Sequence, residues 1–430
     1  MKKRIHISLY LLLLIISALL ILCLLFGWAV WHQSNGGTRL GKSGPYIIKL
    51  AEWPNTIFET TEVKSPLWKK NKTAQTENFF IKNNTQDSGF VLMACYDNKY
   101  KQFVIKLFSI QQQQTIHTWI PDLTVLKSLN KKHGSDIEAS LLEAISFKTQ
   151  HPILTADAGI ILKGEYGLIK LNKASEVEWY TAGKYHHSIE KDFEGNYWTA
   201  GYISPTTLNP TLFPNIKDDA IVKFSAAGKV LFKKSIASIL IENNAMYMLT
   251  GIGQYEEDPI HSNDVEPVLY NSVHWQQGDV FISIRNKSTI LLYNPNTNKI
   301  KWMQTGPWSN QHDITIIDSN RIGVFGNDII RLEKKRFMLT KGYNSFYTYS
   351  FADKKTDTPF NKIFIDHNIA TKSEGRVKLL DNGDLFIEET NYGRVMRVNN
   401  NGIKWCYMET LDKKTVSIMG WSRYYSTLPW

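Results

Sequence analysis

Hydrophobic and polar positions follow two different patterns along this chain of 430 residues. Residues 5–31 are apolar and contain no Asp, Glu, Lys or Arg, whereas from residue 45 onward short apolar runs alternate with polar turns. About 20 consecutive apolar residues are enough to cross a bilayer, and short alternating runs are typical of β-strands. The pattern therefore predicts one membrane-spanning helix followed by a large domain built from strands.

The orientation of the predicted anchor follows from the charges beside it. A basic tip, residues 1–4, precedes the apolar run, and the positive-inside rule places such a tip in the cytoplasm. A cleaved signal peptide is the competing interpretation, but its apolar region is shorter, about 7–15 residues, and ends at small residues. This run instead ends with Trp-Ala-Val-Trp at 28–31. We therefore expect an uncleaved signal anchor at 5–31, with the large domain on the periplasmic side of the inner membrane.

Two further segments differ from the strand pattern. Residues 32–44 are rich in Gly and Ser and indicate a linker between the anchor and the domain at 45–430. Residues 123–148 include a stretch, 137–145, with helical spacing and good helix formers. We expect this region to be a small helical insertion in an otherwise all-β domain.

A repeat emerges in the β-domain from about residue 152 onward. Each unit ends in an apolar strand that closes on an aromatic residue, and the closings lie about 50–70 residues apart, with one copy blurred. Four closings are visible, at residues 177–179, 230–232, 300–302 and 403–405. A repeat that makes four strands is a propeller blade. The length of the domain suits a β-propeller of about six blades.

Charge and cysteine content narrow the function without specifying it. The net charge of +10 comes from 50 basic and 40 acidic residues and is spread in pairs, which is typical of a solvated basic surface with a weak attraction for anions. The sequence resembles no nucleic-acid-binding module. Three cysteines, with no CxxC and no Cys/His zinc pattern, leave one long-range bridge between Cys95 and Cys406 possible. We expect no metal and no diffusible cofactor.

Three histidine-bearing stretches and one arginine lie at predicted strand ends or turns in successive units. They contain His186 and His187, then His261, then Arg285 within an apolar strand region, and then His312. Each of these residues taken alone is compatible with a purely structural role. Equivalent positions of successive blades, however, converge on the axis of a propeller. A guanidinium holds an oxyanion, and imidazoles act as nucleophile, acid or base near neutral pH. The combination predicts an anion site in the central channel.

The sequence around these residues resembles a known family, the PAPS-independent arylsulfotransferases (arylsulfate sulfotransferases). The resemblance is specific over residues 177–327 and looser toward the C-terminus. Its motifs are His186-His187 before a Gly-Asn turn, Asp258-Pro259-x-His261-x-Asn263-Asp264, Ser283-x-Arg285-Asn286, and Gly306-Pro307-Trp308 before Gln311-His312-Asp313. It implies a six-bladed propeller with its site in the central funnel. It also implies transfer of a sulfuryl group from an aryl sulfate to a phenol through a sulfohistidine.

When the roles of the family's residues are assigned to the matching positions of this sequence, the resemblance implies that His312 is the nucleophile. It makes His186 or His187, His261 and Arg285 the groups that hold the sulfuryl group and the bridging oxygen, with Asn263 beside Arg285 in substrate binding. The expected partners are an aryl sulfate, a phenol and, through the helix, the membrane; the oligomeric state stays open. Ser188 departs from the acidic residue that often follows the His pair in the family.

Two other functions compete with this interpretation. The first is a catalytically inert propeller of the cell envelope that binds a ligand or a partner protein, which the Ser188 departure and the unmatched N-terminal third favour. The second, a quinone-dependent dehydrogenase propeller, lacks support because the sequence offers no vicinal Cys pair and no calcium-binding carboxylate cluster. The intact set of three histidine stretches and Arg285 favours the sulfotransferase.

Overall fold

The computed structural model divides the chain into two compact units, Met1–Ser65 and Pro66–Trp430. It describes residues 8–34, 37–44, 46–48, 50–51, 67–72, 78–81, 87–133, 142–164, 166–251, 255–332 and 336–430. The first unit contains the apolar helix α1 (Leu9–Ser34) and the short turn η1 (Gly41–Ser43). Within the described part of the chain, α1 is the one helix long and apolar enough to cross a membrane.

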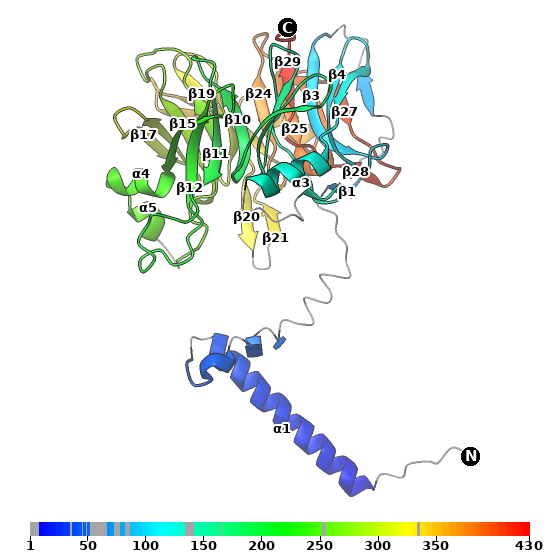
Figure 1. Ribbon diagram of the computed structural model, residues 1–430, viewed down its shortest axis with the longest axis vertical. Coiled ribbons are helices and arrows are strands. Elements are labelled where there is room, and N and C mark those ends of the chain that lie inside the picture. Colours follow the sequence, from blue (N-terminus) through cyan, green and yellow to red (C-terminus); the bar gives the residue numbers. More distant parts are fainter. Residues whose placement is uncertain are drawn as a thin grey trace, which may run out of the picture. The chain divides into compact units, whose positions relative to one another are not determined.

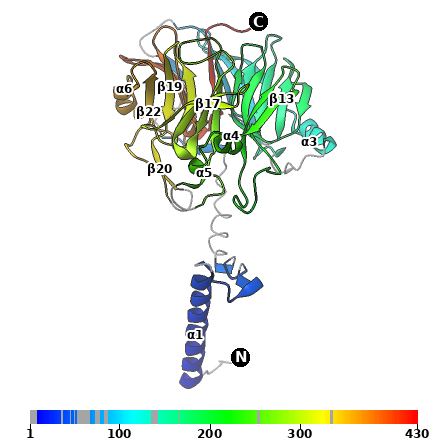
Figure 2. The same ribbon diagram turned by 90° about the vertical axis from the view of Figure 1, so that its left-hand side faces the viewer.

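The second unit is a six-bladed β-propeller, which confirms the predicted fold class (Figures 1 and 2). The first blade consists of β29 (Arg423–Tyr425), β3 (Phe90–Asp97), β4 (Gln102–Ser109) and β5 (Gln114–Trp119). The second consists of β6 (Ile153–Leu154), β7 (Ile160–Gly164), β8 (Gly167–Leu171) and β9 (Val177–Thr181). The third consists of β10 (Tyr185–Lys191), β11 (Tyr197–Tyr202), β12 (Asp219–Phe224) and β13 (Val230–Ser235).

The remaining three blades follow in chain order. The fourth consists of β14 (Ser262–Pro267), β15 (Val280–Ile284), β16 (Thr289–Asn294) and β17 (Lys299–Thr305). The fifth consists of β18 (His312–Ile316), β19 (Arg321–Gly326), β22 (Ser345–Ser350) and β23 (Lys355–Asp357). The sixth consists of β24 (Arg376–Leu379), β25 (Leu385–Glu389), β26 (Arg394–Asn399) and β27 (Gly402–Met408), with β2 (Phe79–Ile81) added at its outer edge.

Strands from both ends of the domain close the propeller. The C-terminal strand β29 pairs with β3 as the innermost strand of the first blade, so that Arg423 lies opposite Leu92. The N-terminal strand β2 pairs with β27 of the sixth blade, and β1 (Trp68–Lys70) pairs with β28 (Thr415–Ser417). Segments from the N-terminal and C-terminal ends of the domain complete the same sheets, and this pairing closes the ring of blades.

The predicted closing pieces are the outer strands of their blades, namely β9, β13, β17 and β27. The repeat unit that the sequence shows least clearly is the fifth blade, for two reasons. Its outer strand β23 carries no aromatic residue, and a hairpin, β20 (Ile329–Leu332) with β21 (Arg336–Leu339), is inserted between β19 and β22. This hairpin projects from the same side of the propeller as helix α5 (Tyr247–Thr250) (Figures 1 and 2).

Few helices accompany the strands. In the expected insertion, helix α3 (Leu123–Lys132) is capped by Asp122, whose carboxylate accepts the backbone N–H groups of Thr124 and Val125. Of the predicted helical stretch, residues 137–141 lie outside the described residues, and 142–146 form turns. The other helices are α4 (Ile236–Glu242) and α6 (Asn361–Asp366). Cys95 and Cys406 are both buried free thiols, so the bridge left possible by the sequence is not formed.

The innermost strands are joined around the axis by one repeated hydrogen bond. A side chain at the start of each strand accepts the backbone N–H of the next blade. The pairs are His151 with Ile189, Ser188 with Val265, Asp264 with Ile314, and Asp313 with Val377. Ser188 therefore holds the place that Asp264 and Asp313 hold in the following blades. The residues directly before three of these acceptors are His187, Asn263 and His312, which fall at equivalent points of successive blades.

Candidate functional site

The structure brings the four predicted imidazoles together on the propeller axis. His186 and His187 lie on β10, His261 directly precedes β14, and His312 begins β18. The ring centroid of His187 is 5.0 Å from that of His186, 5.4 Å from that of His261 and 5.8 Å from that of His312. Residues from three successive blades thus form one cluster around His187.

Local backbone irregularities aim these side chains into the channel. The ladder between β10 and β11 has a register shift between His186 and Ile189, and the ladder between β18 and β19 has one between His312 and Ile314. His187 and His261 adopt left-handed backbone angles, with φ of 61° and 48°. Such angles are unusual for residues other than glycine and cluster at binding and catalytic sites. Bulges also commonly re-aim a side chain beside a site.

The orientation of His312 is determined by Asn327, which follows β19. The amide nitrogen of Asn327 donates to the backbone oxygens of Glu374, at 2.7 Å, and Thr371, at 3.2 Å. Its oxygen therefore faces His312 and lies 2.5 Å from Nδ1. Because an amide oxygen only accepts hydrogen bonds, Nδ1 of His312 carries the proton. The lone pair of the neutral ring is then on Nε2, the nitrogen available for attack.

The other imidazoles also have orienting partners. Asp258 Oδ2 lies 2.8 Å from His261 Nδ1, and the Nδ1 atoms of His186 and His187 lie 2.8 Å apart. Asp219 Oδ1, at the start of β12, lies 3.4 Å from His186 Nε2. A carboxylate beside an imidazole holds one tautomer and stabilises the protonated ring. His261 is therefore the member of the cluster that is best suited to carry a proton.

Burial and neighbouring cations keep most of the cluster neutral. Burial, and secondly the positive charge of Arg285, hold the pKa of His312 well below its usual range. Burial and the adjacent His186 also hold the pKa of His187 well below its usual range. Burial also lowers the pKa of His261, but the carboxylate of Asp258 opposes this effect. A neutral His312 at neutral pH is the form in which an imidazole can act as a nucleophile.

Arg285 supplies a cation beside these rings. The sequence placed it within a strand, but it lies in the turn η3 (Arg285–Lys287) that follows β15. The side chain is 5% exposed, one guanidinium nitrogen donates to Asn286 Oδ1 at 3.0 Å, and Nε has no partner among the described residues. Burial and the nearby Arg331 lower its pKa to about 10, which leaves it charged at neutral pH. A buried guanidinium with an unused donor is suited to an oxyanion.

Asn263, the remaining predicted residue, is buried in β14, two residues after His261 in the sequence. Its amide nitrogen donates to the backbone oxygen of Gln311 at 2.7 Å, whereas its Oδ1 has no partner among the described residues.

Trp421 adds an aromatic wall, because its ring centroid lies 5.9 Å from that of His312 and 6.0 Å from that of His187. The described part of the chain contains no group of His, Cys, Asp and Glu that could hold a metal ion.

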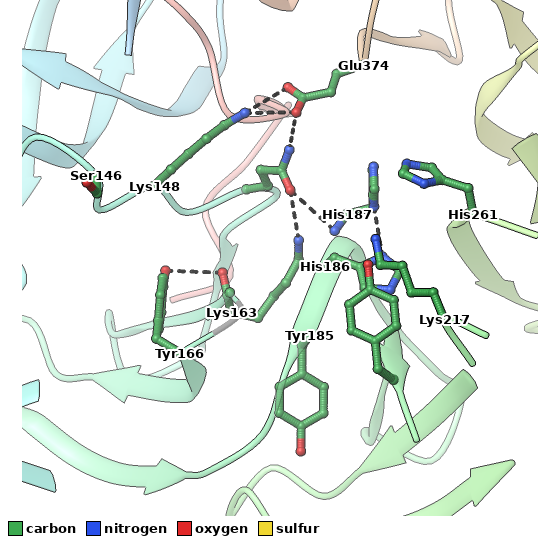
Figure 3. Close-up of a pocket in the computed structure, with 13 residues that line it drawn as sticks. Ser146, Lys148, Lys163, Tyr166, Tyr185, His186, His187, Lys217, His261 and Glu374 are labelled. Atoms are coloured by element: carbon green, nitrogen blue, oxygen red, sulfur yellow. Dashed lines mark hydrogen bonds and ion pairs between the residues drawn. The ribbon is translucent and has the colours of Figure 1, made fainter. Parts of the chain in front are cut away.

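A pocket of about 410 Å³ opens beside the cluster (Figure 3). His186, His187 and His261 form one side of it. The rest of its lining is provided by Ser146, Lys148, Gln150, Lys163, Gly164, Tyr166, Tyr185, Tyr202, Lys217 and Glu374. Pockets of this size bind small molecules. Three of the four imidazoles thus line a space that can hold an organic ligand, whereas His312 and Arg285 are not among its lining residues.

Sequence reasoning missed three residues that orient the cluster. Asp258 lies three residues before His261 in the motif that carries the family resemblance, but no role was predicted for it. Asp219 and Asn327 had no local signal, because Asp219 lies 33 residues after His186 and Asn327 lies 15 residues after His312. Lys163 and Lys217 were likewise not predicted.

The propeller thus carries a cluster of four imidazoles with a buried guanidinium close enough to lower the pKa of His312. The family model described as Arylsulfotransferase (ASST) matches residues 164–409, a segment that contains every predicted site residue. The chain therefore belongs to the arylsulfotransferase family, and the resemblance found in the sequence is confirmed. No curated protein matches the chain.

Several solved structures align with most of this chain at low identity. A protein of unknown function from Bacteroides caccae aligns with 79% of this chain and 100% of its own, at 11% identity and a TM-score of 0.48. TolB from Acinetobacter baumannii aligns with 78% of this chain and 66% of its own, at 10% identity and a TM-score of 0.44. The Pan2 WD40 domain of Neurospora crassa aligns with 79% and 86%, at 9% identity and a TM-score of 0.40.

Proposed function

We propose that this protein transfers a sulfuryl group from an aryl sulfate to a phenol, with His312 as the covalent carrier. The observation that supports this most directly is the state of His312: buried, neutral, protonated on Nδ1 by its bond to Asn327, and beside the charged Arg285. Membership of the arylsulfotransferase family supports the same reaction class.

In the first half-reaction, Nε2 of His312 attacks the sulfur atom. The S–N bond forms as the S–O bond to the aryl group breaks, and the leaving phenolate takes the proton held by His261. Asp258 stabilises the protonated form of His261 from 2.8 Å. Arg285 and Asn263 bind the non-bridging oxygens. Because charge spreads onto these oxygens and the leaving group, preorganised cations and donors provide most of the stabilisation, as in phosphoryl transfer.

In the second half-reaction, a phenol takes the place of the first product. Its hydroxyl oxygen attacks the sulfur atom, the S–N bond breaks, and His261 receives the hydroxyl proton. His312 then returns to its neutral form. Splitting the transfer in two lets one pocket serve donor and acceptor in turn, which is the general logic of covalent catalysis. The other two pocket imidazoles, His186 and His187, would contribute hydrogen bonds to the bound sulfuryl group.

The placement of the reaction is part of the same proposal. Helix α1 anchors the protein in the membrane as an uncleaved signal anchor, with its N-terminus in the cytoplasm. The propeller would then work on the periplasmic side. The length of α1, 26 residues, supports a full crossing of the bilayer.

The function is tested with the full-length protein in detergent, 4-nitrophenyl sulfate as the donor and phenol as the acceptor. We expect sustained release of nitrophenolate that requires phenol, and its loss in His312→Ala. His274→Ala is a matched control, because His274 packs against Trp275 and Phe351, outside the cluster. If wild-type protein transfers nothing from a panel of aryl sulfates, the proposal fails and the ligand-binding propeller becomes the better account.

A further inference from the structure

The hairpin formed by β20 and β21 projects from the end of the propeller at which the imidazoles lie. The inner strands β10 and β18 begin there with the histidine residues, and we call it the histidine end. Strand β19 is antiparallel to β18, with Phe325 opposite His312, so β19 finishes at the histidine end. The hairpin follows β19 and forms a two-stranded sheet of its own, outside the six blades (Figures 1 and 2).

One face of this hairpin is apolar and exposed. Ile330 lies opposite Met338 in the ladder, and Leu332 follows two residues after Ile330. Because side chains alternate between the two faces of a strand, these three share one face. They are 45%, 50% and 39% exposed for Ile330, Met338 and Leu332. Apolar side chains that gather on one projecting face, rather than being scattered singly, mark a binding surface.

The other face of the hairpin is turned toward the site. Phe337 lies opposite Arg331, and its ring centroid is 5.9 Å from Cζ of Arg285. At the base of the hairpin, the backbone N–H of Thr340 donates to the backbone oxygen of Asp328 at 2.7 Å. The hairpin is therefore held against the propeller by one face. Its apolar face points away from Arg285, because the two faces of a two-stranded sheet are opposite.

The charge of the hairpin indicates what its apolar face meets. Residues 329–339 include four basic residues and one acidic residue. The loop 268–279 lies at the opposite end of the propeller, between β14 and β15, and also exposes apolar side chains, among them Leu269 and Val273. That loop, however, contains no Lys or Arg. Apolar side chains combined with a basic neighbourhood are suited to an anionic bilayer, where the first enter the headgroup boundary and the second attract the lipid phosphates.

The chain that comes from α1 also enters the propeller at the histidine end. The first strand, β1, pairs with β28, which ends at Ser417. Trp421, four residues further on, lies with its ring centroid 5.9 Å from that of His312, so β1 and β28 belong to this end. Residues 35–65 separate α1 from the unit that begins at Pro66. A tether raises the effective concentration of the surface beside it, so a small apolar face is enough for docking.

We propose that the histidine end of the propeller docks on the surface of an anionic bilayer, with the apolar face of the hairpin inserted among the lipid headgroups. The inference rests on the placement proposed above, in which α1 crosses the membrane, and it does not depend on sulfuryl transfer. Docking in this way would turn the imidazole cluster toward the membrane.

Fluorescence quenching by lipid tests the inference on the full-length protein. The protein is placed in nanodiscs of phosphatidylglycerol and phosphatidylcholine that carry nitroxide groups on their acyl chains. An environment-sensitive fluorophore is attached at Met338→Cys, in a Cys23→Ala background, because Cys95 and Cys406 are buried. We expect the probe to be quenched and its emission shifted to the blue. The same probe at Val273→Cys, an exposed position at the opposite end, should show neither effect.

A matched pair of substitutions shows whether the apolar face is responsible. Ile330→Asp should remove most of the quenching at position 338, because a carboxylate resists entry into the apolar boundary. Leu269→Asp is the control, since Leu269 is also 45% exposed but lies at the opposite end, and it should leave the quenching unchanged. Replacing phosphatidylglycerol by phosphatidylcholine, or raising the salt concentration, should weaken the quenching by removing or screening the attraction to the headgroups.

Equal quenching at positions 338 and 273, or quenching at 338 that survives Ile330→Asp, overturns the inference. An unquenched probe at 338 also overturns it. If that probe instead shifts to the blue with protein concentration in detergent, a second copy of the chain covers the face. Protein that does not stay in the nanodiscs overturns the anchor and the inference together. Release of nitrophenolate from the same samples separates the two proposals: docking without transfer overturns the proposed reaction alone, and transfer without docking overturns the inference alone.

Discussion

Replacing Asn327 should slow the proposed sulfuryl transfer without touching the reacting atoms. In the structure, Asn327 Oδ1 accepts the Nδ1 proton of His312 at 2.5 Å, which leaves the lone pair on Nε2. In Asn327→Leu, a side chain of similar shape, that acceptor is gone. A buried N–H without a partner costs about 1–3 kcal/mol, so the proton moves to Nε2, where it blocks attack.

The size of the effect follows from this cost. Each 1.4 kcal/mol, roughly, changes the population of the attack-competent tautomer tenfold. We therefore expect kcat for sulfuryl transfer to fall about 10–100-fold in Asn327→Leu, with little change in the KM for the donor. The substitution also removes the hydrogen bonds that Asn327 donates to the backbone oxygens of Thr371 and Glu374, although Asn344 still donates to Thr371, so stability must be measured alongside the rate.

Asn327→Asp separates tautomer control from folding. A carboxylate keeps an acceptor for Nδ1 but loses both bonds to the carbonyl oxygens, as the leucine variant does. It should retain more activity than Asn327→Leu, with an optimum at higher pH, because a negative charge raises the pKa of His312. ¹⁵N NMR of labelled histidines reports the tautomer of His312 independently of turnover. If His312 remains protonated on Nδ1 in Asn327→Leu, or if kcat is unchanged, the reasoning is refuted.

Three other predictions address the anion site, the buried carboxylates and the anchor. Arg285→Lys keeps a charge but loses the planar fork, so steady-state kinetics should show kcat/KM for the donor lower by about 10–100-fold, and a wild-type value would remove Arg285 from the site. Burial raises the pKa of Asp264 to about 8, so the folded protein holds an extra proton there and its stability falls as pH rises toward that value. In urea unfolding, Asp264→Asn should flatten this decline between about pH 6 and 8, and an unchanged slope would refute the assignment. Intact-mass analysis of protein extracted from membranes should find the segment 5–31 attached, and a mature N-terminus near residue 33 would show that it is cleaved.

Much of the fold was predictable because its signals are local. The uncharged run at 5–31 indicated α1, and aromatic closings indicated the outer strands of four blades. The fifth blade was obscured because β23 has no aromatic residue and a hairpin interrupts its middle. Closure by β29 and β2 could not be predicted, since it pairs strands from opposite ends of the chain.

The candidate site likewise contains residues that the sequence pattern predicted and residues that only the folded structure shows. His187 and His312 recur at the same point of their units, and His261 lies two residues before the equivalent position, so the repeat itself predicted that they meet. Arg285 was predicted to join them, although its turn was mistaken for a strand. Asn327 could not be found this way, because ordinary polar residues near strand ends are common and only the folded chain shows which one meets His312. The cations of the pocket were missed for the same reason.

The central claim is that His312 carries the sulfuryl group between donor and acceptor. The most direct measurement is to incubate the full-length protein with an aryl sulfate alone, quench at alkaline pH and map the modified peptide by mass spectrometry. The account predicts one sulfuryl group on His312, its discharge when phenol is added, and no label in His312→Ala. An active enzyme that shows no label on His312, or a His312→Ala variant that transfers at the wild-type rate, would contradict it.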